Sequence, residues 1–215
     1  MRTMTVEELY DYLRSPQFLD AKSGNIFYNY YIYQYPADTE YTMRRQIVEF
    51  KQKLERPTSY QDALVLDLFE VFCDYLRSEK FGDQTLFDDT IEEDKTNPEA
   101  VTKELTDEAN SDAFISFVNR RITEHVTSPS PDEKDKTLIF VHGIGKMFPY
   151  MRTNVFLTRY EKYNDPNSYR IVLFYPGHQE GNSFSLFDCL DDAHTYRAIL
   201  LVTPVRDKKL SKIMF

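Results

Sequence analysis

The sequence predicts an α/β fold in which about five mostly parallel strands form one sheet with helices on both faces. Apolar, β-branched runs alternate along the chain with segments of helical periodicity. The runs at 137–141 and 169–175 are apolar enough to be buried on both faces, which is typical of parallel strands. Helical crossovers between such strands favour a Rossmann-like or P-loop-like architecture, here without a functional Walker A motif.

The first element is a helix that begins at a capping box. In Thr5-Val-Glu-Glu8, the hydroxyl and the carboxylate can satisfy opposite backbone N–H groups. Ser15-Pro16 ends this helix, because the residue before a proline disfavours the helical conformation. The next elements follow from apolar runs and periodicity, and are a strand at 25–33, a helix at 39–55, a strand at 63–68 and a helix at 70–77.

An acidic segment follows. Residues 83–112 hold eleven acidic residues and two lysines, which accounts for the net charge of −9 of the whole chain. We expect an acidic helical insertion near 80–126, with short solvated helices over 80–106 and a clearer helix that Asn110-Ser111 caps and that runs to Val126. A linker-like break near 127–136 is short and neither side of it has a complete core, so 1–215 is expected to be a single α/β domain.

Two glycine-rich loops mark the candidate site. The elements after the break are a strand at 137–141, a helix at 150–162, a strand at 169–175, a short helix at 185–190 and a strand at 197–202. The loops 142–149 and 176–183 hold four of the six glycines and two of the four histidines. Parallel strands share a carboxyl end, so both loops should leave the sheet at the edge where open α/β sheets bind ligands or partners. The candidate contact residues are His142, Gly143, Gly145, Lys146, Arg152, Gly177, His178, Glu180, Gly181, Asn182 and Ser183.

The first loop matches a phosphate-binding loop only in part. The motif would need glycine where Phe140 stands and a serine or threonine where Met147 stands. Without that hydroxyl, the usual magnesium ligand is missing. Lys146 is therefore predicted not to be a catalytic phosphate-binding lysine.

The other enzymatic constellations are also incomplete. Gly181-Asn-Ser183-Phe-Ser185 lacks the second glycine of a nucleophile elbow, and the acid and base candidates Asp188, Asp191 and His194 lie too close to it in sequence. A metal site would need His142, His178 and Glu180 to meet, and histidines at loop tips more often form hydrogen bonds in turns. We expect no cofactor, no metal and no enzymatic activity.

The composition of the chain limits the classes of partner and the cellular compartment that we expect. Outside the acidic segment the chain is close to neutral, which argues against autonomous nucleic-acid binding. Cys73 and Cys189 have no metal-ligand spacing and lie in predicted helices, so we expect reduced thiols. No apolar run reaches the length of a membrane span, and the first residues lack the apolar stretch of a signal peptide. These observations predict a cytoplasmic protein that does not enter a membrane.

Ordered motifs of the C-terminal half are similar to those of a known family. They are Phe140-Val-His-Gly-Ile-Gly-Lys-Met-Phe-Pro-Tyr-Met-Arg152, Val172-Leu-Phe-Tyr-Pro-Gly177, Ser183-Phe-Ser-Leu-Phe187 and Tyr196-Arg-Ala198. Their combination resembles the BrxB family of bacterial BREX phage-exclusion systems, formerly a domain of unknown function. A leading helix and an aromatic segment ending at Tyr35-Pro36 extend the resemblance over most of the chain.

The resemblance implies a small non-catalytic component of a phage defence system that modifies host DNA. Its implied partners are other BREX components, first the alkaline-phosphatase-like protein and then the ATPase or the methyltransferase. The family has no established catalytic residues, in agreement with the incomplete motifs. We therefore expect an adaptor or scaffold that docks other proteins of the system. The alternative is an enzyme that binds a nucleotide or a phosphate ester at the loops 142–149 and 176–183.

Overall fold

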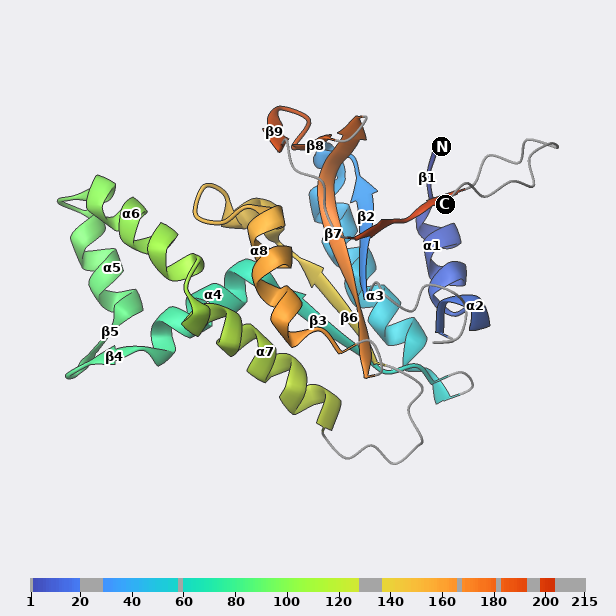
Figure 1. The fold of residues 1–215 in the computed structure, drawn as a ribbon, viewed down its shortest axis with the longest axis horizontal. Helices are drawn as coiled ribbons and strands as arrows, with labels where there is room; N and C mark the ends of the chain where they lie inside the picture. Colours follow the sequence, from blue (N-terminus) through green and yellow to red (C-terminus); the bar gives the residue numbers. More distant parts are fainter. Residues whose placement is uncertain are drawn as a thin grey trace.

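The computed structural model describes residues 2–19, 29–57, 60–127, 137–165, 168–180, 183–192 and 198–203. Its centre is a parallel sheet with the strand order β10-β2-β7-β6-β3 (Figure 1). These strands are β2 (Tyr30–Tyr35), β3 (Ala63–Asp67), β6 (Thr137–His142), β7 (Tyr169–Glu180) and β10 (Ile199–Leu200). The predicted α/β class and the mostly parallel sheet are confirmed.

Helices cover both faces of this sheet, as predicted. Successive side chains of a strand point to opposite faces, so Tyr31 and Tyr33 of β2 belong to one apolar core, and Tyr30 and Ile32 belong to another. The helices of the first core are α1 (Val6–Leu13), α2 (Pro16–Leu19) and α3 (Glu40–Leu54). The main helices of the second are α4 (Leu68–Ser78), α7 (Asp112–Thr127) and α8 (Thr153–Tyr160). Figure 1 shows α1 and α2 on one side of the sheet and α7 and α8 on the other.

Capping residues begin two helices where the sequence predicts them. The Thr5 hydroxyl accepts a hydrogen bond from the Glu8 N–H, and the Glu8 carboxylate accepts one from the Thr5 N–H. At α7, the Ser111 hydroxyl accepts a hydrogen bond of 3.0 Å from the Phe114 N–H. Both caps satisfy backbone donors that the first helical turn leaves without partners.

The first part of the predicted acidic insertion forms a lobe that stands away from the sheet, whereas its last part is α7, which packs in the second core (Figure 1). We call residues 80–109 the helical lobe; its elements are β4 (Lys80–Phe81), β5 (Gln84–Thr85), α5 (Leu86–Asp94) and α6 (Pro98–Ala109). The expected solvated helices are α5 and α6, and the antiparallel pair β4–β5 precedes them. The linker-like break lies outside the described residues from 128 onward.

The segment after Tyr175 differs from the prediction. Instead of a loop at 176–183 and a helix at 185–190, β7 continues to Glu180 and pairs antiparallel with β8 (Ser183–Leu186), which pairs with β9 (Leu190–Asp192). The physical reason is a two-residue alternation, because Phe184 and Leu186 are buried in the second core. Cys189 therefore lies in the β8–β9 turn and not in a helix; it is exposed, Cys73 in α4 is buried, and both are free.

The structure also gives two strands other ends than the sequence predicts. The run at 25–33 is described from Asn29 onward, and β2 extends to Tyr35. In place of one strand at 197–202 there are β10 and β11 (Val202–Thr203), and β11 pairs antiparallel with β1 (Arg2–Thr3). Residue 197 lies outside the described residues. None of the described helices is both long enough and apolar enough to cross a membrane.

Candidate functional site

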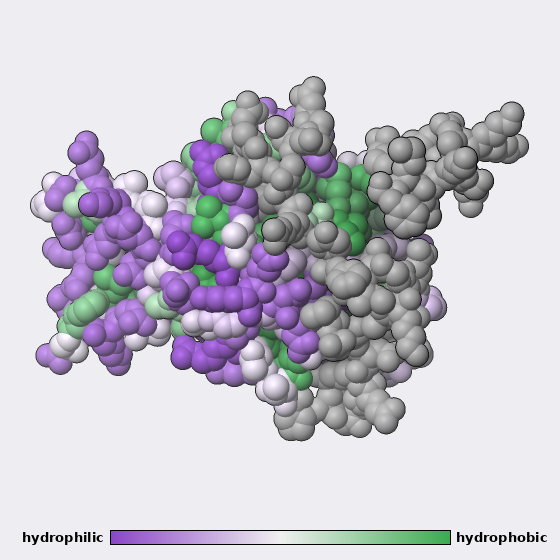
Figure 2. Space-filling model, in the orientation of Figure 1, coloured by the Kyte–Doolittle hydropathy of each residue, from purple (hydrophilic) through white to green (hydrophobic). Residues whose placement is uncertain are grey.

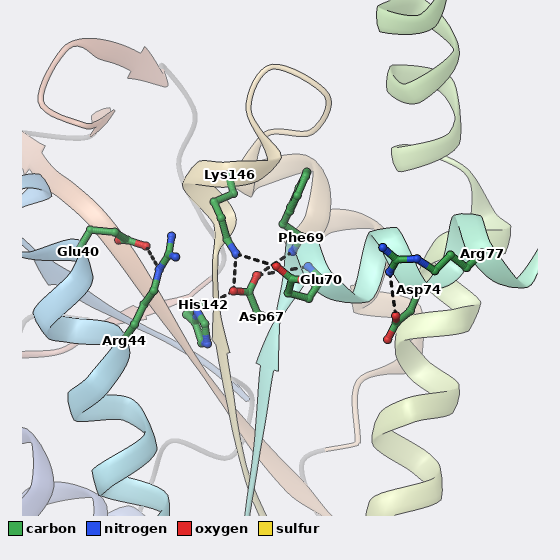
Figure 3. A network of polar contacts seen from close by, with 9 residues as sticks. All are labelled: Glu40, Arg44, Asp67, Phe69, Glu70, Asp74, Arg77, His142 and Lys146. Carbon is green, nitrogen blue, oxygen red and sulfur yellow. Dashed lines mark hydrogen bonds and ion pairs between the residues drawn. The ribbon is translucent and has the colours of Figure 1, made fainter. Parts of the chain in front are cut away.

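A cluster of charged side chains lies at the carboxyl ends of β3 and β6. Asp67 and His142 are the last residues of these strands and are register partners in the sheet. Lys146 comes from the short 3₁₀ helix η3 (Ile144–Met147) that follows β6. Its Nζ atom lies 2.5 Å from Asp67 Oδ2 and 3.5 Å from Glu70 Oε1 (Figure 3). The lysine is thus neutralised by carboxylates from the neighbouring strand and helix.

Asp67 is the centre of this cluster. Besides its ion pair with Lys146, its Oδ1 atom accepts hydrogen bonds from the N–H groups of Phe69 and Glu70 and caps α4. The side chain is 17% exposed, so its charge is only partly screened by water. The sequence analysis missed Asp67; the signal available was its place between an apolar run and a helix, which is an N-cap position.

Gly143 allows this carboxylate to come close to the first loop. Its φ of +76° lies in the left-handed region, and a Cβ atom there would lie 2.3 Å from Asp67 Oδ1. In a phosphate-binding loop, glycines let the backbone approach a phosphate. Here the close neighbour of Gly143 is a protein carboxylate, and Ile144 and Met147 of the following turn are buried.

His142 is buried beside the ion pair. The residue is 7% exposed, and its Nδ1 atom lies 3.6 Å from Asp67 Oδ2, which is too long for a hydrogen bond. Burial lowers the pKa of His142; the Asp67 charge opposes this effect, and the Lys146 charge reinforces it. The imidazole is therefore held neutral near pH 7.

A second polar group approaches from α3. The Tyr35 hydroxyl donates a hydrogen bond to Glu40, and Arg44 Nε lies 2.9 Å from Glu40 Oε1 (Figure 3). Burial raises the pKa of Tyr35, and the Glu40 charge raises it further. Arg44 and Glu40 both act on the His142 ring through their charges. Lys146 and Arg44 are thus both paired with carboxylates, whereas His142 Nδ1 is buried without a hydrogen-bond partner among the described residues.

The buried histidine predicts a pH-dependent stability. Its folded-state pKa lies below the ordinary value, so the unfolded chain takes up this proton more readily and the protein loses stability as the pH falls below about 6.5. We expect the melting temperature to fall more between about pH 8 and pH 5 in the wild type than in His142→Gln. Thermal unfolding of both proteins over this range measures the difference. An equal fall in the melting temperature of both proteins would contradict the lowered pKa of His142.

The turn between β8 and β9 lies against the first candidate loop. Phe187 in this turn has a left-handed φ of 55°, which is unusual for a bulky residue. Its ring packs so closely on Gly145 that a Cβ atom there would lie 2.3 Å from the ring Cζ. The prediction that the strands at 137–141 and 169–175 are parallel is confirmed, and the segments that follow them meet at one edge.

His178 lies near the end of β7, where this strand pairs with β8. Its Nδ1 atom is 2.6 Å from Asp188 Oδ1, and both side chains are about half exposed, at 53% and 47%. The two histidines of the potential metal site therefore have different partners. His142 is buried beside Asp67, whereas His178 pairs with Asp188. Among the described residues, no group of three or more His, Cys, Asp or Glu side chains could hold a metal ion.

The remaining candidate residues lie around the same edge. Arg152 is exposed at the N-terminus of α8, with its guanidinium 6.0 Å from the centre of the Phe148 ring. Gly177 lies in β7 against the backbone of β8. Glu180 and Ser183 are placed by their backbone in β7 and β8, and Gly181 and Asn182 lie outside the described residues.

Comparison with known proteins gives the family. Residues 64–201 match the family described as BREX protein BrxB. A BREX protein BrxB of Bacillus cereus (strain H3081.97) is 24% identical over 200 residues, which cover 92% of this chain and 95% of that protein. A BREX protein BrxB of Escherichia coli O9:H4 (strain HS) is 20% identical over 192 residues, covering 88% and 86%. No solved structure matches. The family match spans more than half of the chain and agrees with the motifs at the sheet edge, so this protein belongs to the BrxB family.

Proposed function

We propose that this protein is a non-catalytic adaptor or scaffold of a BREX-type phage defence system, and that it docks other proteins of that system in the cytoplasm. The observation that carries the proposal is the pairing of Lys146 with Asp67 and Glu70 beneath the first loop. A lysine that holds a substrate phosphate must offer its ammonium group to that phosphate. Here a capping carboxylate already takes that place.

The surroundings of the two histidines favour the same conclusion. A neutral histidine such as His142 can act as a base, but this residue is only 7% exposed and cannot reach a substrate in solution unless the edge rearranges. His178 is accessible, but its partner is a carboxylate on an exposed turn rather than a nucleophile. These contacts support a rigid recognition surface rather than an enzyme that acts on a nucleotide or a phosphate ester.

The proposed docking surface is the edge formed by the two candidate segments. It comprises His142, Gly143, Gly145, Lys146, Arg152, Gly177, His178, Glu180, Gly181, Asn182 and Ser183. Within it, the exposed side chains of Arg152 and His178 are the accessible polar contacts, whereas His142, Gly143 and Lys146 support the surface from below. The first expected partner is the alkaline-phosphatase-like protein, followed by the ATPase and the methyltransferase of the system.

Truncation of the exposed contacts tests this surface. Arg152→Ala combined with His178→Ala should reduce the amount of the partner that co-purifies by about tenfold, because a few residues dominate the affinity of most interfaces. Cells that carry the complete system provide the complex, and the melting temperature of the isolated variant measures its fold. Phage plating on the same cells measures defence, which should fall together with complex formation.

A matched control removes a charge elsewhere. Arg159 is an exposed residue of α8 that pairs with Asp112, and Arg159→Ala should change neither co-purification nor defence. Loss of defence with the fold and every partner interaction intact would contradict the adaptor and would require an activity at this edge. A rise in melting temperature with saturating nucleotide would favour the enzymatic alternative.

A further inference from the structure

An open groove runs along the helical lobe. It has a volume of about 550 Å³ and lies between α5 and α6, beside the β4–β5 pair. The residues that line it include Phe81, Leu86, Asp89, Glu92, Glu93 and Glu104. The lobe stands away from the sheet in Figure 1, so the groove is separate from the edge that carries the proposed docking surface.

The groove offers apolar surface to solvent. Phe81 is 65% exposed although it carries a large aromatic ring, and Leu86 of the same lining is buried at 6% exposure. Figure 2 shows the lobe as mostly hydrophilic with hydrophobic patches between the polar residues. Aromatic residues are enriched at the centre of protein interfaces, where polar residues form the rim.

The charge of the groove is negative and poorly compensated. Four of its side chains are carboxylates, and neither lysine nor arginine contributes to its described lining. Within the described residues, Glu92 pairs with Lys95 at 3.0 Å, whereas Asp89, Glu93 and Glu104 form no ion pair. Burial raises the pKa of Glu104, and the charges of Glu93, Glu108 and Asp89 raise it further. A positively charged partner would relieve this repulsion.

We propose that this groove docks a basic, amphipathic segment of a partner protein. Lysine or arginine side chains of the segment pair with Asp89, Glu93 and Glu104, and an apolar side chain packs on Phe81. The inference goes beyond the proposed function, because it adds a second surface with its own chemistry. A protein with both surfaces could hold one partner at the sheet edge and another on the helical lobe at the same time.

A short helical peptide of leucine and lysine, with its lysines on one face, is the probe. We expect it to bind the full chain and to shift backbone amide signals of α5 and α6 in NMR spectra. Glu93→Gln combined with Glu104→Gln should raise the dissociation constant about tenfold, and Phe81→Ser should also weaken binding. Both changes should leave the fold intact, since they remove a repulsion and an exposed ring.

The matched control is Glu99→Gln combined with Asp107→Asn. These exposed residues of α6 lie outside the groove lining, and the double variant has the same net charge as the groove variant. It should bind the peptide as the wild type does, and so should Arg152→Ala with His178→Ala. A peptide of leucine and glutamate should not bind.

Three results would overturn the proposal. One is a failure of the lysine peptide to bind, and another is an equal loss of binding in the groove variant and the charge-matched control, which would show an unspecific attraction. The third is self-association that Phe81→Ser abolishes, because the groove would then hold a second copy of this chain. The variant Arg152→Ala with His178→Ala tests the two proposals separately. If it binds the peptide normally, the groove acts independently of the sheet edge, and a failure of one proposal does not decide the other.

Discussion

Gly177→Ala is expected to lower the free energy of unfolding by about 3 kcal/mol, because the new Cβ atom would meet backbone rather than a movable side chain. The glycine has a φ of +140°, and its Cβ would lie 2.0 Å from the Ser185 carbonyl oxygen. To relieve this contact, β8 would have to move away from β7 and uncover Phe184 and Leu186. The hairpin that carries His178 would then lose its position.

Thermal unfolding measures this effect. A loss of about 3 kcal/mol corresponds to a fall in melting temperature of roughly 6–12 °C for a domain of this size. Gly82→Ala is the matched control, since Gly82 also has a left-handed φ, of +65°, but a Cβ atom there would have nothing within 4 Å. The control should lose only the strain of a left-handed alanine, about 1–2 kcal/mol. Equal losses in the two variants would contradict the close packing of β8 on β7.

Asp67→Ala is expected to cost about 3 kcal/mol of stability as well. The change removes the cap of α4, which contributes about 1 kcal/mol, and leaves Lys146 without its nearest carboxylate in a site where its side chain is 24% exposed. Asp67→Asn should lose less, because an amide oxygen can still cap the helix. Chemical denaturation gives the free energy of unfolding of both variants. The loss in Asp67→Asn reports mainly the ion pair, and the additional loss in Asp67→Ala reports the cap.

A double-mutant cycle tests the contact between Asp67 and the first loop. Gly143→Ala should be strongly destabilising in the wild type, since its Cβ would meet the Asp67 carboxylate. In the Asp67→Ala background it should cost only the strain of a left-handed alanine, about 1–2 kcal/mol. Additive losses would show that the carboxylate does not sit over Gly143.

The parallel core could be predicted because its signals are local. Continuous apolar runs at 137–141 and 169–175 fit strands buried on both faces, and the structure places them side by side. The hairpin of β8 and β9 was not predicted, because Phe184-Ser-Leu186 is too short to reveal its alternation and Pro176-Gly177 suggests a loop. The packing of Phe184 and Leu186 against the second core decides the structure there.

The polar cluster at the sheet edge could be predicted only in part. The sequence places His142 and Lys146 at the end of a strand, and the missing glycine and hydroxyl argue against a phosphate site. Their partner Asp67 comes from a distant part of the chain, and its place beside His142 depends on the register of β3 against β6. Register is a property of the assembled sheet, so no local pattern reveals this pair.

The position of β2 between β10 and β7 limits the order in which the chain can fold. In the part of the chain that the structure describes, β2 pairs with β7 and β10, both of which come much later in the sequence. By contrast, β3 and β6 enclose α4 to α7 and can pair as soon as β6 has been synthesised. On a growing chain, β2 must therefore wait without a partner while the middle of the protein forms. The two pairs of β2 are therefore among the last contacts of the sheet to form on a growing chain, after β7 and β10 have been synthesised.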